Sequence, residues 1–319
     1  MNTPNKNNYS LLDRKDDLKK EAEKVLSFNL SDTVKSRIFS NLSMYDRLCD
    51  FENIPVEHDI IVALEQLSEY FNIPPVITYE SLILLNDFDG SPSLFSEENA
   101  ADEILFYKTH FDIEYLFYEI HEIVFDFYSW NSSALVVEDL IANIWLIAKK
   151  LHHLMSHMKG SSFNALRPYW SLSWHYRKDE NWKAYPGPSW AYTCWFVYMD
   201  MLLGIKDINI DSYSMDDRML PNISWSGYIT KSELDELKIL IKEKGVLSDM
   251  LPEENQWIQE LKRSVLKFRL WHKQAARKYI WDENLEQPWT WGAKNASAFL
   301  DDHIEETKLS ISNNLLKDI

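Results

Sequence analysis

Two histidines lie in segments with helical patterning and have neighbours that indicate chemistry. His110 shares one stripe of a predicted helix with Phe106 and Glu114, because these residues are spaced four apart. His272 is flanked by basic residues, namely Arg269, Lys273, Arg277 and Lys278. A neutral imidazole with cationic neighbours, in an acidic protein, is what a haem iron and its propionates require. Taken alone, each histidine is more simply a surface residue or a hydrogen-bonded core residue.

The other reactive side chains indicate less. His152 and His153 are adjacent and therefore face different sides of a helix, whereas His157 lies four residues beyond His153 and could form a two-histidine metal face with it. No third ligand is evident nearby, so a surface role is the simpler interpretation. Cys49 and Cys194 are too few for a disulfide framework or a zinc ribbon. The sequence also contains no HExxH, no glycine-rich phosphate loop and no GxSxG.

Long helices must position these residues. Apolar residues recur at helical spacing, Gly and Pro are few (7 and 11), and neither a strong two-residue alternation nor a repeat is visible. We therefore predict an all-α chain. The predicted helices span residues 16–28, 57–72, 101–130, 136–158, 188–203, 231–244 and 254–280, with Gly204 and Gly245 closing two of them. A loop at residues 86–99, rich in Asp, Ser, Gly and Pro, divides a smaller N-terminal helical part (1–95) from a larger helical domain (96–319).

Charge and composition limit the partners of the protein. The 319 residues include 33 Lys and Arg against 50 Asp and Glu, a formal net charge of −17. Such a charge argues against binding to nucleic acid and to anionic membranes, which both attract basic surfaces. The start of the chain is polar, and no uncharged run of about 18 apolar residues occurs, so we expect a cytoplasmic protein with no secretory signal or transmembrane helix. The 13 Trp, 16 Tyr and 15 Phe suit a packed core or a flat apolar cavity.

Five segments carry a resemblance to a known family. In order, they read LSEYFNIPPVITYESLILLN, DEILFYKTHFDIEYLFYEIHE, SFNALRPYWSLSW, YPGPSWAYTCWFVYMDMLLGIKD and FRLWHKQAARKYI. They resemble, in the same order, segments of the haem-dependent indoleamine and tryptophan 2,3-dioxygenase superfamily, which includes the ring-rearranging synthase of the pyrrolnitrin pathway. The second resembles the helix pattern DExLFxxxHxxxELxxxxxxHE, the fourth contains D-x-L-L-G-I near its end, and the fifth contains the R-x-x-H of the proximal-histidine helix. Together they span roughly residues 65–300.

The resemblance implies roles for individual residues. His272 would be the proximal ligand of the iron of haem b (iron protoporphyrin IX). His110 would be the distal histidine, which could accept a hydrogen bond from the indole N–H or steer bound O2. Phe106 and Phe163 would line the distal pocket, and Arg167 would hold the carboxylate of the substrate with its planar fork.

Further positions follow from the same resemblance. Tyr79, Leu82 and Ile83 match the indole pocket of the indoleamine branch, and Ser189 matches the small residue of a Gly-Gly-Ser-Ala segment. A hydrogen-bond acceptor for the other ring nitrogen of His272 is expected, and Asp216 or Asp217, where the alignment is loose, is the candidate. The implied fold is an all-α, multi-helical haem domain with a smaller N-terminal part. The family includes monomers and tetramers, so a homo-oligomer is compatible with it.

The sequence departs from the family where substrate would be enclosed. The Gly-Thr-Gly-Gly lid is replaced by PWTWGAKNASAFL, in which Thr290 lies between two tryptophans. The pair Gly-Gly becomes Gly187-Pro188, and the alanine becomes Trp190. We therefore expect a haem-dependent oxygenase that acts with O2 on the indole ring of tryptophan or a derivative, with ring rearrangement or monooxygenation as the alternative outcome. A non-catalytic haem or indole binder, or an all-α interaction protein without cofactor, would be the alternatives outside the enzyme class.

Overall fold

The computed structural model describes residues 11–88, 92–130, 135–170, 174–178, 181–185, 199–205, 231–250, 255–279 and 301–311. This part of the chain is mainly helical, as predicted. Its elements are η1 (Leu11–Arg14), α1 (Lys15–Ser27), α2 (Asp32–Phe51), α3 (His58–Phe71), η2 (Glu80–Leu84), α4 (Ala100–Trp130), α5 (Leu135–His157), α6 (Gly160–Trp170), β1 (Trp174–Lys178), β2 (Asn181–Tyr185), α8 (Lys231–Lys244), α9 (Leu247–Met250) and α10 (Asn255–Tyr279). Residues 301–309 are also helical.

Most helix bounds agree with the predicted ones within two residues. The predicted helix end at Gly245 is confirmed, since this residue has a φ of +92° and ends α8 in a conformation that favours glycine. Gly204 likewise has a φ of +60° and follows the helical residues 199–202. Most of the helix predicted at residues 188–203 lies outside the described residues.

The pattern did not predict α2. Its buried side chains include Ser36, Ser40, Asn41, Ser43 and Arg47 among the apolar ones. These polar residues interrupt the apolar stripe by which an amphipathic helix is recognised. Two of them have tertiary partners: Asn41 Nδ2 donates to Glu21 Oε2 at 3.1 Å, and Arg47 Nε donates to the carbonyl of Tyr169 at 3.3 Å. The hydroxyls of Ser36 and Ser43 donate to carbonyls of α2 itself.

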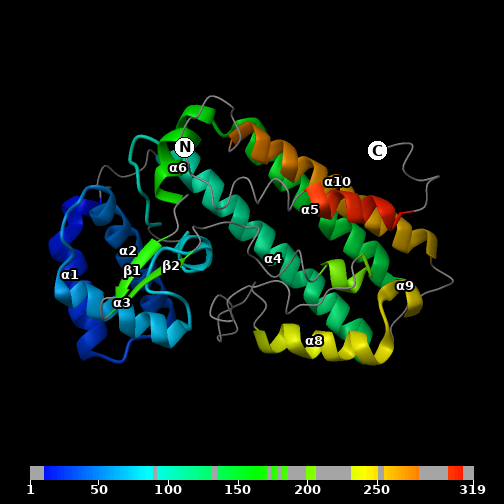
Figure 1. Ribbon diagram of the computed structural model, residues 1–319, viewed down its shortest axis with the longest axis horizontal. Coiled ribbons are helices and arrows are strands. Elements are labelled where there is room, and N and C mark those ends of the chain that lie inside the picture. Colours follow the sequence, from blue (N-terminus) through cyan, green and yellow to red (C-terminus); the bar gives the residue numbers. More distant parts are fainter. Residues whose placement is uncertain are drawn as a thin grey trace. The chain divides into compact units, whose positions relative to one another are not determined.

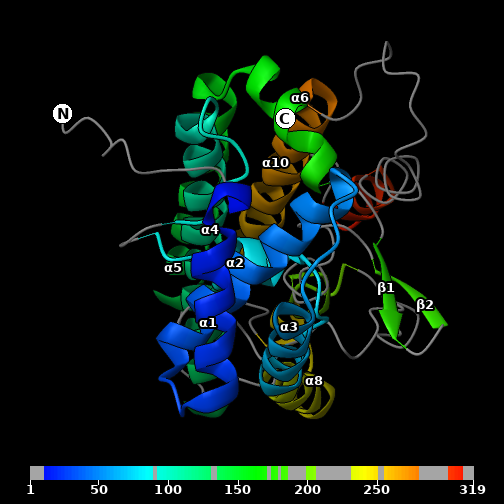
Figure 2. The ribbon, with the colours of Figure 1, turned by 90° about the vertical axis from the view of Figure 1, so that its left-hand side faces the viewer.

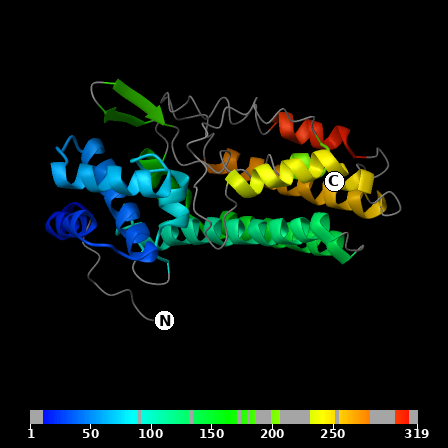
Figure 3. The ribbon, with the colours of Figure 1, turned by 90° about the horizontal axis from the view of Figure 1, so that it is seen from below.

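A small antiparallel hairpin departs from the all-α prediction. Strands β1 and β2 lie side by side (Figure 3). They pair Trp174 with Tyr185 and Lys178 with Asn181. Each strand has five residues, which is too short for a period of two to stand out in a tryptophan-rich stretch. Among the described residues it is the only sheet.

The chain folds into two compact units, and each combines two separate stretches of sequence. Unit 1 comprises Met1–His110 and Met158–Trp190, and unit 2 comprises Phe111–His157 and Ala191–Ile319. The division therefore does not follow the boundary expected at residues 95 and 96. Residues 96–110 and α6 belong to the same unit as the N-terminal helices, and the long helix α4 contributes to both units.

In unit 1, helices α1, α2 and α3 pack against one another (Figure 2). The predicted linker at residues 86–99 is bound to this unit where it is described. Asn86 and Ser93 exchange two hydrogen bonds, of 3.1 and 2.7 Å, between the Asn86 side chain and the Ser93 backbone. The ring of Phe95 stacks on Tyr169 of α6 at 4.8 Å. A polar, turn-rich sequence thus forms part of a core because its side chains bind its own backbone.

In unit 2, α10 lies along α5 (Figure 1). Lys150 of α5 pairs with Asp112 of α4 at 2.8 Å, and Phe268 of α10 contacts Phe117 of α4 with an edge-on geometry at 6.2 Å. Residues 301–311 also pack on α10, because Ile304 and Ile311 join Leu266 in a buried cluster. None of the helices within the described ranges is long and apolar enough to cross a bilayer.

Candidate functional site

Four aromatic residues that the sequence assigned to one pocket lie together in unit 1. We call Tyr79, Phe106, His110 and Phe163 the aromatic cluster. The ring of His110 lies 4.2 Å from that of Phe106 and 6.3 Å, edge-on, from that of Tyr79. Phe106 in turn lies 6.0 Å from Phe163. The structure therefore brings together residues from three of the resembling segments. Tyr79 directly precedes η2, Phe106 and His110 lie on α4, and Phe163 lies on α6.

Helical spacing accounts for the proximity of two residues of the aromatic cluster, and tertiary packing brings the other two to them. Phe106 and His110 are one turn apart on α4, so their side chains lie on one face of that helix. Tyr79 and Phe163 reach them only because the segment before η2 and the start of α6 fold onto α4 within unit 1. Tyr79 and Phe163 are buried, and Phe106 and His110 are partly buried.

The tautomer of His110 follows from its hydrogen bond. Nδ1 lies 2.8 Å from the carbonyl oxygen of Phe106. A carbonyl only accepts, so Nδ1 carries the proton and donates it. Burial lowers the pKa of the His110 imidazole from 6.5 to about 4, against the smaller opposite effect of this hydrogen bond. At neutral pH the ring is therefore uncharged and Nε2 presents a lone pair. This nitrogen accepts a hydrogen bond and has none to donate.

Leu82 and Ile83 lie in η2 and are buried in unit 1, as expected of residues that line an apolar site or a core. A reciprocal pair of hydrogen bonds between Thr78 and Ser81 holds the start of this segment: the Ser81 hydroxyl accepts from the Thr78 amide at 2.8 Å, and the Thr78 hydroxyl accepts from the Ser81 amide at 3.2 Å. The segment that carries Tyr79 is therefore fixed by its own side chains.

Arg167 lies on α6, one turn after Phe163. The structure describes its backbone and not its side chain. Ser189, Thr290, Asp216 and Asp217, for which the sequence analysis gave expectations, all lie outside the described residues.

His272 lies in unit 2, on α10, and is partly buried. Its ring is parallel to that of Phe268, one turn earlier, at an interplanar angle of 4° and a centroid distance of 6.2 Å. The neighbouring Trp271 points to a different side, where it contacts Trp145 and His152 of α5. Because it is partly buried, His272 is not a fully solvated histidine.

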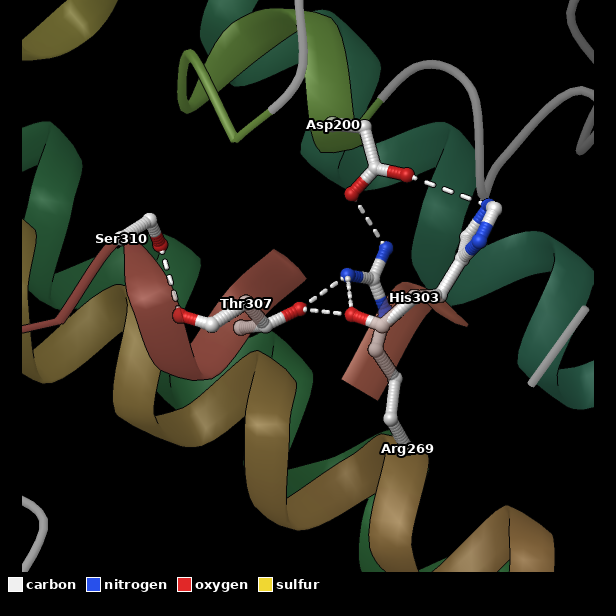
Figure 4. Close-up of polar contacts among 5 residues, drawn as sticks. All are labelled: Asp200, Arg269, His303, Thr307 and Ser310. Atoms are coloured by element: carbon white, nitrogen blue, oxygen red, sulfur yellow. Dashed lines mark hydrogen bonds and ion pairs between the residues drawn. The ribbon is translucent and has the colours of Figure 1, made fainter. Parts of the chain in front are cut away.

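One turn before His272, Arg269 lies in a buried polar network (Figure 4). Its Nη2 donates to Asp200 Oδ1 at 2.5 Å, and its Nη1 donates to the carbonyl of His303 at 3.2 Å and to the hydroxyl of Thr307. The second oxygen of Asp200 lies 3.4 Å from His303 Nε2. Arg269 and Asp200 come from the R-x-x-H and D-x-L-L-G-I segments of the resemblance, which the structure brings into direct contact.

Three of the four basic residues around His272 have partners within the protein. Arg269 binds inside the protein, and Lys273 pairs with Asp301. Lys278 donates to the carbonyl of Met155. Arg277 is exposed. The first three side chains find acceptors on packed neighbouring segments, which a linear sequence does not reveal.

The sequence analysis did not single out the residues that bind Arg269. Asp200 is contained in the D-x-L-L-G-I segment, so the resemblance could have identified it as a partner of the R-x-x-H arginine. His303 and Thr307 follow the resembling segments and belong to no motif. Glu103 was also missed: its buried carboxylate accepts from the amides of Phe95 and Ser96 at 2.8 and 3.1 Å.

The pair His153 and His157 is exposed on α5, with ring centroids 4.0 Å apart. Nδ1 of His157 donates to the carbonyl of His153 at 2.8 Å. Within the described part of the chain, no group of three or more His, Cys, Asp or Glu side chains could hold a metal ion. The described residues thus offer no third ligand to this pair.

No protein-family model matches the sequence, and no curated protein is significantly similar to it.

Proposed function

We propose that this chain is a haem-dependent oxygenase that acts with O2 on the indole ring of tryptophan or of a tryptophan derivative. The observation that carries the proposal is the aromatic cluster. In this cluster a neutral imidazole, whose Nε2 carries no proton, lies with three other aromatic rings. Flat apolar walls with one oriented acceptor suit a flat apolar ring system that carries one N–H group, which is what an indole is.

The residues of the chain fit haem as the cofactor. A porphyrin supplies the equatorial nitrogens itself and needs one axial imidazole from the protein, so a cluster of three protein ligands is not required. His272 offers such an imidazole: it is partly buried on a long helix beside the apolar ring of Phe268. When bound, haem supplies the activation of O2 for oxidation of the indole C2–C3 bond, and the protein supplies binding and orientation.

The proposed roles of the other residues follow from their chemistry. His110 Nε2 accepts the indole N–H and so fixes the rotation of the ring. Phe106 and Phe163 contact the faces and edges of the indole and exclude water. Arg167, one turn after Phe163 on α6, holds the substrate carboxylate in a bidentate ion pair. Together these contacts hold the substrate in one orientation.

The altered lid sequence favours a second outcome. Because Trp289 and Trp291 flank Thr290 where the family has glycines, we propose ring rearrangement or monooxygenation of a modified indole as the alternative to dioxygenation. A non-catalytic haem or indole binder is the alternative outside the enzyme class.

Two measurements test the proposal. The absorption spectrum of the chain, purified from cells supplied with a haem precursor, should show a Soret band that His272→Ala abolishes. A wild-type protein without this band rejects haem binding, and a band that His272→Ala leaves unchanged rejects His272 as the ligand. Incubation with tryptophan, ascorbate and O2, followed by mass spectrometry, then separates addition of two oxygen atoms, of one, or of none. Spectral shifts on adding tryptophan without turnover would indicate a binding protein.

A further inference from the structure

The helical segment 301–309, together with residues 310 and 311, packs along the part of α10 that carries His272. Ile304 and Ile311 pack with Leu266 in a buried apolar cluster against which Leu270 also packs. Further along α10, Lys273 forms an ion pair with Asp301, the first residue of the same segment. One face of α10 is thereby covered over two turns, on either side of Arg269. We call residues 301–311 the C-terminal clamp.

Arg269 forms the directional hydrogen bonds between α10 and the C-terminal clamp. Its guanidinium group has hydrogen-bond donors in a fixed planar fork. These donors bind acceptors on two segments distant in sequence: Asp200, and the His303 carbonyl with the Thr307 hydroxyl (Figure 4). Arg269 and His303 are 1% and 2% exposed, and Asp200 and Thr307 are 0% exposed. Because water is excluded, the orientation of the fork depends on these protein acceptors.

His303 contributes to the network twice. Its backbone carbonyl accepts hydrogen bonds from Arg269 and from the hydroxyl of Thr307, the latter at 2.5 Å. Its ring Nε2 lies 3.4 Å from Asp200 Oδ2, while Arg269 binds the other oxygen of the same carboxylate. The carboxylate is thus contacted on both oxygens, and its rotation would weaken one contact or the other. Ser310 extends the arrangement by donating to the carbonyl of Thr307 at 2.8 Å.

We infer that His303 and Thr307 of the C-terminal clamp are positioning residues that fix the rotation of the α10 turn from Arg269 to His272. Arg269 and His272 are three positions apart, so both side chains belong to one helical turn. Any rotation or unwinding of this turn that reorients the His272 ring also displaces the guanidinium from its buried acceptors. Where the consequence concerns iron, the inference rests on the proposed function: the clamp then sets the orientation of the axial imidazole.

The first test does not depend on haem. In full-length protein, hydrogen exchange is measured on the peptide of α10 that spans Arg269 to His272. His303→Phe removes the ring nitrogen near Asp200, and Thr307→Val removes the hydroxyl with little change in volume. Both should speed exchange in this peptide. His303→Gln, whose amide nitrogen reaches about as far as Nε2, should restore it. Leu309→Ala is the matched control, because Leu309 lies on the same segment and is 86% exposed. Unchanged exchange in α10 for both His303→Phe and Thr307→Val would overturn the inference. If His303→Phe fails to fold, the result for Thr307→Val decides alone.

The second test reads the axial imidazole itself. In haem-loaded protein, His303→Phe should shift the electron paramagnetic resonance signature of the ferric iron, and haem loss to an acceptor globin should be about tenfold faster, as for other residues that orient a metal ligand indirectly. His303→Gln should resemble the wild type, and Leu309→Ala should be silent. An unchanged signature in His303→Phe, with haem bound, would contradict the role toward iron. If the wild type binds no haem, the proposed function fails, and the exchange experiment still decides whether the clamp fixes α10.

Discussion

At the scale of single residues, the orientation of one imidazole determines what the aromatic cluster can do. The sequence analysis left two roles open for His110, accepting the indole N–H or steering O2. The hydrogen bond from Nδ1 to the Phe106 carbonyl leaves Nε2 as an acceptor, and burial keeps the ring neutral by lowering its pKa to about 4. A nitrogen without a proton has nothing to donate to O2. The geometry therefore favours the role toward the indole.

This role predicts discrimination between two substrates of nearly the same shape. The benzothiophene analogue of tryptophan replaces the indole N–H with sulfur, so it should bind the wild type about fivefold more weakly, because one net hydrogen bond is worth about 1 kcal/mol. His110→Ala should bind both compounds alike. Spectral titration of the haem-bound protein measures the two dissociation constants. Equal affinity of the wild type for both compounds would contradict the role of Nε2.

At the scale of elements, buried polar side chains join segments that the sequence separates. Glu103, in the first turn of α4, accepts from the amides of Phe95 and Ser96 and from the hydroxyl of Tyr107. It therefore fixes the end of the predicted linker to the helix that carries His110. Burial is the largest influence on its carboxyl group and raises the pKa from 4.5 to about 7, although the three hydrogen bonds oppose this effect.

This raised pKa predicts a pH dependence of stability. A carboxyl with a higher pKa in the folded state binds more protons there, so its contribution is present below pH 4.5 and is lost as the pH rises through about 7. Urea unfolding at pH 5 and at pH 7.5 should show a smaller loss of stability over this interval for Glu103→Gln than for the wild type, by on the order of 2 kcal/mol. Glu97→Gln, on the surface of the same region, is the control. Identical pH profiles for the wild type and Glu103→Gln would show that the carboxyl does not titrate in this range.

At the scale of the whole molecule, the chain alternates between its two units. It leaves unit 1 after His110, returns at Met158 and leaves again after Trp190. Neither unit is therefore encoded by one continuous stretch. The aromatic cluster illustrates the consequence, since its four residues come from both stretches of unit 1.

The alternation predicts the outcome of a truncation. Residues 96–319, which the sequence analysis treated as a separate domain, should not fold cooperatively alone. Removal of residues 1–95 deletes Arg47, which binds the Tyr169 carbonyl, and Phe95, which stacks on the Tyr169 ring. The remaining α6 and the start of α4 would expose apolar surface. Thermal unfolding followed by circular dichroism should show a broad transition for the truncated chain and a sharp one for the full chain. A sharp transition for the truncated chain would support the boundary at residues 95 and 96.

The local pattern determined the helices, and its limits have a physical cause. Apolar spacing and glycine ends located α1, α3, α4, α5, α8 and α10, because these signals depend on residues a few positions apart. The helix α2 was missed because its buried face holds several serines together with Asn41 and Arg47, and the last two bind partners elsewhere in the chain. The short hairpin was missed because five residues give too little alternation.

For the candidate site, the sequence by itself determined which residue types are available and which of them share a helix face, as for Phe106 and His110. Only the tertiary structure decided that Tyr79 and Phe163 join them, and that Arg269 is buried against Asp200 and the C-terminal clamp. The physical reason is that hydrogen bonds and burial depend on distances in space. A linear sequence specifies such distances only within a helical turn or a strand pair.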